Sequence, residues 1–299
     1  MEKSKKVITR RDFIRTGSYV TMGSLMGLPL LSTAAAKNTA KSRVVLIRDK
    51  HVIKPDGSLH RDSLEEIFDE ALTTLLNAAD AASAWRQLFK PSDVVGVKSN
   101  VWARLPTPSY LEAVIKKRLV AAGVKEQHIA IDDRGVRRNP VFKQSTALIN
   151  VRPLRTHHWS GLGTLLKNYI MFVSSPWNYH GNSCERLGAI WKKAGVKGKT
   201  RLNILVMLTP LFHGVGPHHY SKRYTWAYCG LIVSTDPVAA DAVGARIIQA
   251  KRFEYFGKDR PISPPPRHIE AADIKFGLGN SHPDRIDLIK LGWQEDVFI

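Results

Sequence analysis

The stretch that decides the fold class is residues 93–133, which read DVVGVKSNVWARLPTPSYLEAVIKKRLVAAGVKEQHIAIDD. The apolar run at 93–100 predicts a buried strand, and residues 108–123 predict a helix that ends at Gly123. A second apolar run at 128–135 predicts another strand. Strand, helix and strand joined by short turns are typical of a parallel, right-handed crossover unit.

The same alternation continues along the rest of the chain. Further apolar runs predict strands at 43–47, 146–151, 201–208 and 229–235. Patterns of helical period or apolar composition predict helices at 61–89, 161–173, 184–195, 236–250 and 268–279. We therefore expect an α/β fold with a mostly parallel sheet covered by helices on both faces, as a single domain or two closely packed lobes.

The N-terminus has the features of an export signal. Residues 9–15, TRRDFIR, resemble the twin-arginine signal, and a small-residue exit favours cleavage after Ala36. The alternative is a membrane anchor. Against it, the apolar segment 17–31 contains three glycines and a proline and is shorter than the roughly 20 residues that span a bilayer. We expect a signal at 1–36, a linker at 37–42 and an α/β domain at 43–299.

This assignment predicts a periplasmic protein whose first partner is the twin-arginine translocation machinery. No later run of 18 apolar residues occurs, so no transmembrane span is expected in the mature chain. Residues 1–36 hold six bases and two acids, and their removal lowers the net charge from +19 to +15. Such a charge favours a small anionic molecule or an envelope polymer as partner, or is simply a solvated surface. Nucleic acid is not expected for an exported protein.

The two cysteines, Cys184 and Cys229, allow few structural predictions. They could pair in an oxidising compartment, and the sequence leaves that open. No C-x-x-C occurs, so a self-contained iron-sulfur motif is not expected. A divalent metal, if one binds, needs ligands gathered from distant loops.

Polar side chains gather where the predicted strands end. In open α/β sheets a ligand usually lies beyond the carboxyl ends of the strands. The residues placed there, together with an amide from the next segment, are the candidates for binding an anionic substrate: Lys98, Asn100, Asp132, Arg155 and Asn168.

The candidates for proton transfer are Lys167, His157 and His180. Lys167 lies in the apolar segment 161–173, where it either extends to the surface or is buried with a lowered pKa that suits an acid or a base. His157 is either a base or metal ligand, or a hydrogen-bonded loop histidine. His180 is a candidate base or ligand.

The metal candidates are His180, Cys184, His213 and His218. Either Asn182 and Glu185 form a capping box or Ser183 is the cap. Both alternatives predict Cys184 in the first turn of a helix with a lowered thiol pKa. His213 and His218 lie in the turn LFHGVGPHHY at 211–220, which is either a metal-binding surface or a loop that closes over an anion.

Three stretches together resemble the domain-of-unknown-function family 362. They are residues 93–100 with the helix start at 107–115, LINVRPLRTHHWSGLGTLLKN at 148–168, and GLIVSTDPVAADAVGARII at 230–248. The resemblance covers about residues 43–292 and favours roles for His157 and Lys167. The chain departs from the family pattern at Val206 and Met207, where a carboxylate is common, and at Arg155, where lysine is common.

Two hypotheses follow from these observations. The first is an exported enzyme of unknown reaction that acts on a small anionic substrate, with or without a divalent metal at the strand ends. The second is a non-catalytic periplasmic binding or accessory protein for an anionic ligand or an envelope polymer. A closed pocket with a strongly perturbed lysine or histidine favours the first, and a broad basic groove favours the second.

Overall fold

The structure is a computed structural model that describes residues 41–214, 216 and 219–299. The expected export signal at 1–36 and candidate ligand His218 lie outside the described residues.

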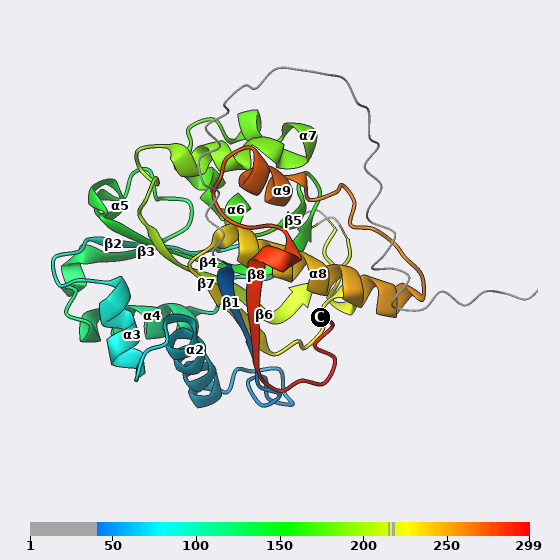
Figure 1. The fold of residues 1–299 in the computed structure, drawn as a ribbon, viewed down its shortest axis with the longest axis horizontal. Helices are drawn as coiled ribbons and strands as arrows, with labels where there is room; N and C mark the ends of the chain where they lie inside the picture. Colours follow the sequence, from blue (N-terminus) through cyan, green and yellow to red (C-terminus); the bar gives the residue numbers. More distant parts are fainter. Residues whose placement is uncertain (1–40, 215, 217–218) are drawn as a thin grey trace, which may run out of the picture. The chain divides into compact units, whose positions relative to one another are not determined.

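An eight-stranded mixed sheet organises the described chain (Figure 1). Its strands are β1 (Ser42–Arg48), β2 (Val95–Lys98), β3 (Ile129–Asp132), β4 (Ala147–His157), β5 (Gly161–Gly163), β6 (Thr200–Leu211), β7 (Gly230–Ser234) and β8 (Ile286–Gly292). The order is β3-β2-β4-β6-β7-β1-β8, with β5 paired to β4. Only β5 and β7 run antiparallel to their neighbours, so the expected mostly parallel sheet is confirmed.

Helices cover both faces of this sheet, as expected. The α-helices of the described residues are α2 (Arg61–Leu76), α3 (Ala81–Leu88), α4 (Ser109–Ala121), α5 (Pro140–Gln144), α6 (Leu165–Asn168), α7 (Gly181–Cys184), α8 (Pro237–Phe256) and α9 (Arg267–Ile274). The core on one face includes side chains of α2, α3 and α4. The core on the other includes side chains of α5, α6, α8 and α9 (Figure 1).

The long helix α8 begins where the sequence predicts. The Asp236 carboxylate accepts hydrogen bonds from the backbone N–H of Val238 at 2.8 Å and of Ala239 at 3.0 Å, which satisfies two donors of the first turn. Pro237 occupies the first helical position, where a missing N–H has no consequence. Asp236 also accepts from Asn280 N at 2.8 Å and from the Ser42 hydroxyl, so this cap connects α8 to β1 and to the segment between α9 and β8.

The prediction of a single helix at 61–89 is wrong, because the chain forms two helices there. Asn77 adopts a left-handed conformation with φ of 51° and ends α2. Asp80 then caps α3, and its side chain accepts from Ser83 N at 2.6 Å. Asn tolerates the left-handed region better than most residues, which makes it a natural stop for a helix.

The helix expected at 161–173 is also wrong. The segment instead forms β5, the short α6, and the 3-10 helix η2 (Tyr169–Phe172). Gly161 has a φ of +70°, and a Cβ there would lie 2.0 Å from the carbonyl oxygen of Pro264, so the chain turns at this residue. All four residues of α6 are buried, which explains why a compact turn has the composition of a core helix.

The third correction concerns the helix expected at 184–195. Asn182, Ser183 and Cys184 have φ values of 49°, 56° and 64°, and the 3-10 helix η4 (Glu185–Lys192) follows them. The expected capping box is replaced by a hydrogen bond between the side chains of Asn182 and Glu185. Cys184 is fully buried, and burial raises the pKa of its thiol, opposite to the expected lowering.

Two further features complete the described fold. The sheet gains β8, which the sequence did not predict and which pairs in parallel with β1. Within the described part of the chain, no helix combines the length and the apolar composition that crossing a bilayer needs.

Candidate functional site

A cavity of about 270 Å³ opens at the carboxyl ends of β2, β3 and β4, on the face covered by α6. Six of the predicted site residues line it, namely Asn100, Arg155, His157, Lys167, Asn168 and His180. The remaining lining residues are Trp102, Asp133, Arg134, Arg152, Ile170 and Met171. We call this space the candidate pocket.

A buried ion pair lies at the base of the candidate pocket. Lys98 at the end of β2 is fully buried and pairs with the carboxylate of Asp133, and its ammonium group also donates to Ser99 O at 2.6 Å. Burial lowers the pKa of Lys98 to about 8, and Asp133 opposes that shift. Burial alone would raise the pKa of Asp133, but Lys98 holds it below its ordinary value. Both groups are therefore charged near pH 7.

Asn168 connects the strand ends to α6. Its side-chain oxygen accepts from Lys98 Nζ at 3.2 Å and from Asn100 Nδ2 at 3.4 Å. Its amide nitrogen donates to Asn150 Oδ1 at 2.9 Å. These contacts use both ends of a fully buried amide, so Asn168 fixes the pocket wall and leaves little capacity to bind a ligand.

Two arginines of β4 bring positive charge to the candidate pocket. Arg152 is 4 % exposed and donates to Thr164 O at 3.3 Å. Arg155 is 5 % exposed, donates to Asn100 Oδ1 at 3.0 Å and lies 4.4 Å from the ring centre of Trp102. Burial lowers the pKa of Arg152 to about 10 and that of Arg155 well below its ordinary value, but arginine stays protonated near neutral pH.

The Nε atoms of both arginines are buried and have no hydrogen-bond partner among the described residues. Neither side chain forms an ion pair with a carboxylate in that part of the chain. Gly163 makes this arrangement possible, because a Cβ there would lie 2.5 Å from a terminal nitrogen of Arg152.

Lys167 is the third cation without a carboxylate partner among the described residues. It is 3 % exposed, so of the two alternatives the buried one is observed. Its Nζ lies 3.6 Å from the Sγ of Cys184. Burial lowers the pKa of Lys167 to about 8, and the nearby Arg152 adds to the lowering. A lysine with this pKa can hold or release a proton near neutral pH.

The two predicted histidines are neutral in this surrounding. Burial, followed by the charge of Lys167, lowers the pKa of His157 far below its ordinary value and that of His180 to about 4. His157 Nδ1 accepts from Trp159 N at 3.2 Å, which places the proton of the neutral ring on Nε2. His157 is thus arranged as a hydrogen-bond donor. The His180 ring lies 3.9 Å from that of the half-exposed Trp159.

Two of the other predicted residues, Asp132 and His213, do not line the candidate pocket. The Asp132 carboxylate does not line the pocket but accepts from Gly135 N at 2.8 Å and from Asn139 Nδ2 at 3.4 Å, so it closes a turn. His213 lines a separate cavity. Both Cys184 and Cys229 are free. In the described chain, no three His, Cys, Asp or Glu side chains converge in a way that could hold a metal ion.

The sequence places Asp132 and Asp133 together at one strand end, but only Asp132 is among the predicted binding residues, and neither Arg152 nor Trp102 is predicted. Asp133 follows Asp132 directly, and the sequence cannot tell which of two adjacent carboxylates turns into a site. Arg152 had a usable signal, because it lies with Arg155 in the mostly apolar run ALINVRPLR of β4. Two arginines three residues apart in a buried strand need charged or hydrogen-bonding partners, which indicates a polar site beside them.

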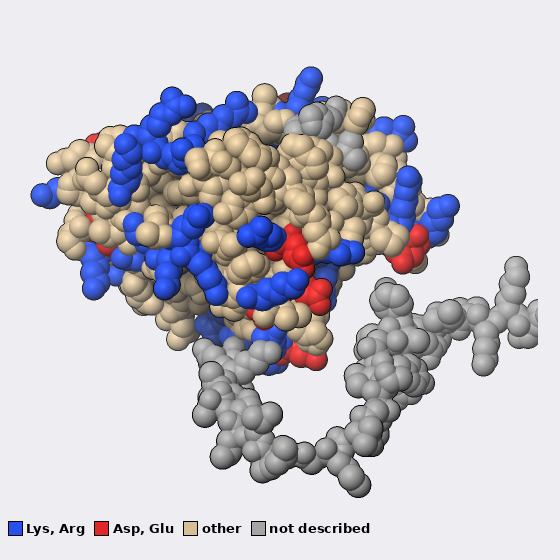
Figure 2. All heavy atoms as spheres, turned by 90° about the horizontal axis from the view of Figure 1, so that it is seen from above, with Lys and Arg blue, Asp and Glu red and all other residues tan. Residues whose placement is uncertain are grey.

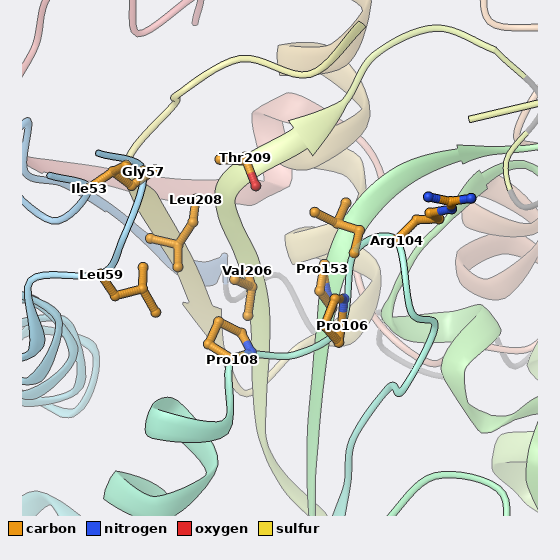
Figure 3. Close-up of a pocket in the computed structure, with 11 residues that line it drawn as sticks. Ile53, Gly57, Leu59, Arg104, Pro106, Pro108, Pro153, Val206, Leu208 and Thr209 are labelled. Atoms are coloured by element: carbon orange, nitrogen blue, oxygen red, sulfur yellow. The ribbon is translucent and has the colours of Figure 1, made fainter. Parts of the chain in front are cut away.

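A cavity of different character lies on the opposite face of the sheet. It measures about 290 Å³ and is lined by Ile53, Gly57, Leu59, Arg104, Leu105, Pro106, Pro108, Pro153, Val206, Leu208 and Thr209. Figure 3 shows the side chains of Val206, Pro106 and Pro108 along its walls. Arg104 alone among these residues carries charge, so the cavity offers apolar walls and no evident acid or base.

Residues 113–246 match a family model described as Domain of unknown function (DUF362), so the chain carries a DUF362 domain there. The match includes Arg152, Arg155, His157, Lys167 and His180, whereas β2 with Lys98 and Asn100 precedes it. No curated protein and no solved structure matches this chain.

Proposed function

We propose that the DUF362 domain of this chain binds a small anionic molecule in the candidate pocket, and that the protein is an exported enzyme in which Lys167 transfers a proton to or from that molecule. The observation that carries the proposal is the charge around the pocket. Arg152, Arg155 and Lys167 are buried cations that form no ion pair with a described carboxylate, and Asp133 is already paired with Lys98.

Buried charges are normally paired, because moving an ion out of water without a partner costs several kcal/mol. An anion in the pocket supplies the missing partner for all three cations. Guanidinium groups suit this task, since they bind carboxylate or phosphate oxygens through two parallel hydrogen bonds. The free Nε atoms of Arg152 and Arg155 leave donor capacity for such a ligand.

The chemistry of the pocket favours proton transfer. Lys167, with a pKa of about 8, can act as acid or base near neutral pH, and neutral His157 can donate a hydrogen bond from Nε2. Trp102 and Trp159 contribute aromatic surface near Arg155 and His180. We assign no step to a divalent metal, because His180, Cys184 and His213 do not form a common ligand set.

The alternative is a non-catalytic protein that captures an anionic ligand or an envelope polymer. Figure 2 shows a face of the molecule on which Lys and Arg side chains are more prominent than Asp and Glu. A basic surface of this kind attracts polyanions without any reaction. In the enzyme, loss of Lys167 abolishes turnover, whereas in the binding protein it only weakens affinity.

The test is anion binding followed at the pocket itself. We expect small di- and tricarboxylates or inorganic phosphate to shift the NMR signals of the His180 ring in the full-length chain at constant ionic strength. Arg155→Gln should weaken that binding about tenfold or more, because it removes a charged hydrogen-bond donor. Affinity should also fall as the pH rises above about 8, since Lys167 then loses its charge.

Two variants serve as controls. Lys98 also has a pKa of about 8, so Lys167→Met decides which lysine causes the pH dependence: it should flatten the profile if Lys167 is responsible. Arg246→Gln removes an exposed charge outside the pocket and should leave affinity unchanged. The proposal fails if no anion moves the His180 signals, or if Arg246→Gln weakens binding as much as Arg155→Gln.

The export part of the proposal has its own experiment. It is supported by the twin arginines Arg10 and Arg11 and by the small-residue exit at Ala36. Replacing both arginines by lysine keeps the charge, and we expect the protein then to accumulate in the cytoplasm instead of the periplasm. Cell fractionation measures this distribution. Equal periplasmic amounts of the variant and the unchanged chain would argue against export by this route.

A further inference from the structure

A second basic cavity lies near the same end of β4. It measures about 410 Å³ and is lined by Thr156, His213, Gly214, His219, Arg252, Arg260, Pro261 and Ser263. Arg155 and His157 line the candidate pocket, whereas Thr156 between them lines this cavity. Successive side chains of a strand point to opposite sides, so neighbouring residues at the end of β4 line different cavities. None of the described lining residues is acidic.

Arg252 of α8 is the central cation. It is 4 % exposed, and its guanidinium group donates to the backbone oxygens of Arg260 at 2.8 Å, Phe212 at 3.0 Å and Pro261 at 2.9 Å. These bonds hold the guanidinium in place, but carbonyl dipoles do not cancel its charge. It forms no ion pair with a described carboxylate, so the cavity keeps a fixed positive charge.

His213 is oriented by Arg252. The guanidinium donates to His213 Nδ1 at 3.0 Å, which leaves the proton of the neutral ring on Nε2. Burial, followed by the charges of Arg252, Arg260 and Arg223, lowers the pKa of His213. No acidic group of the described residues contributes to that shift. An anion beside the ring would therefore act in the opposite direction and raise the pKa.

Thr156 supplies the observation that points to a ligand. The residue is 4 % exposed and lines the cavity, and its hydroxyl oxygen is buried without a hydrogen-bond partner among the described residues. A buried hydroxyl without a partner is unfavourable, so such groups are normally satisfied. A ligand that accepts a hydrogen bond here removes that penalty.

We propose that this cavity is a second anion site, which binds a phosphoryl or similar tetrahedral oxyanion group beside Thr156, His213, Arg252 and Arg260. The donors come from three separate parts of the chain, namely β4, the segment after β6, and α8 with the segment that follows it. Donors that approach from several directions suit the three oxygens of a phosphoryl group better than the two coplanar oxygens of a carboxylate. The site is independent of the candidate pocket.

The test uses inorganic phosphate and the full-length chain. The ring signals of His213 are identified by their loss in His213→Gln, and the pKa of His213 is then measured by NMR in phosphate and in chloride at equal ionic strength. We expect phosphate to raise the pKa of His213 and acetate to raise it less. Arg260→Gln should weaken phosphate binding about tenfold, and Thr156→Val about fivefold, because each removes one donor to the anion.

Matched controls separate this site from general charge effects and from the candidate pocket. Arg246→Gln removes one exposed charge of α8 that does not line the cavity, and it should change phosphate affinity at His213 by less than about twofold, as expected for a screened surface charge. Arg155→Gln should leave the His213 response intact even where it weakens binding at His180. The proposal is overturned if phosphate moves the pKa of His213 no more than chloride does, if acetate equals phosphate, or if Arg246→Gln weakens binding as much as Arg260→Gln.

Discussion

An Asp133→Asn variant should have a free energy of unfolding about 3–5 kcal/mol below that of the unchanged chain at pH 7, because the substitution leaves Lys98 as a buried cation without a counter-charge. The side chains of the pair are 0 % and 8 % exposed, so water cannot replace the lost carboxylate. Asp133 also accepts from Val101 N at 3.0 Å and faces the charge of Arg152. Urea unfolding followed by circular dichroism measures the difference.

The matched control is Asp287→Asn. Asp287 pairs with Arg43 at 3.3 Å, but both side chains are almost half exposed, and the loss should be below about 1 kcal/mol. The double variant Lys98→Met, Asp133→Asn removes both charges and should recover part of the stability lost in the single variant. If Asp133→Asn lowers the free energy of unfolding as little as Asp287→Asn does, the ion pair does not stabilise the pocket as described.

The second large effect is expected at Asp241, which lies in the second turn of α8 and is fully buried. Its two carboxylate oxygens accept from the backbone N–H of Leu165 and of Leu166, each at 2.9 Å. These are the first residues of α6, the turn that carries Lys167. Asn at this position offers one acceptor and turns an N–H₂ group toward the other donor, so Asp241→Asn should lower the free energy of unfolding by about 3 kcal/mol at pH 5.

The pH dependence of this loss has a definite sign. Burial raises the pKa of Asp241 from 3.8 to about 7 in the folded protein, against the hydrogen bonds from Thr164, Leu166 and Leu165. The folded chain therefore holds this proton to higher pH than the unfolded chain does. Between about pH 4 and pH 7 the unfolded state ionises first, and the unchanged protein loses stability as the pH rises.

Asp241→Asn lacks this titration. The difference in free energy of unfolding between the variant and the unchanged protein should therefore shrink between pH 5 and pH 8. Urea unfolding at several pH values measures it. A difference that stays constant between pH 5 and pH 8 would show that the carboxylate is ionised throughout and that its bonds to α6 outweigh burial. Weaker anion binding in the same variant would connect Asp241 to the position of Lys167.

Much of the sheet could be predicted from local pattern. The apolar runs that became β2, β3 and β7 are short and bounded by polar residues, and Asp236 with Pro237 is a strong helix start. Lys98, Asn100 and Arg155 were placed correctly at one rim, because the carboxyl ends of parallel strands share an edge of the sheet.

The errors arose where tertiary contacts decide the local conformation. Asn77 and residues 182–184 adopt left-handed conformations that helical periodicity does not reveal. Segment 161–173 is apolar because it is buried, and burial alone does not distinguish a helix from a compact turn. The sequence of β8 alternates only weakly between apolar and polar residues. Its pairing depends on β1, which lies more than 240 residues away in the chain.

The candidate site was predictable in its location but not in its charge balance. Lys167 could be selected because a lysine in an apolar segment is unusual. That its neighbours are Arg152 and Cys184 rather than a carboxylate depends on how α6 and η4 pack, and spacing along the chain contains no information on this.

The place of β1 in the sheet has a consequence during synthesis. β1 lies between β7 and β8, and these are the two strands with which it pairs. While the ribosome adds the residues between Arg48 and Gly230, the apolar segment VVLI of β1 has neither native neighbour. Until β7 emerges, this segment is exposed to other nascent chains as an unpaired strand, and a chaperone that shields it would raise the yield of folded protein.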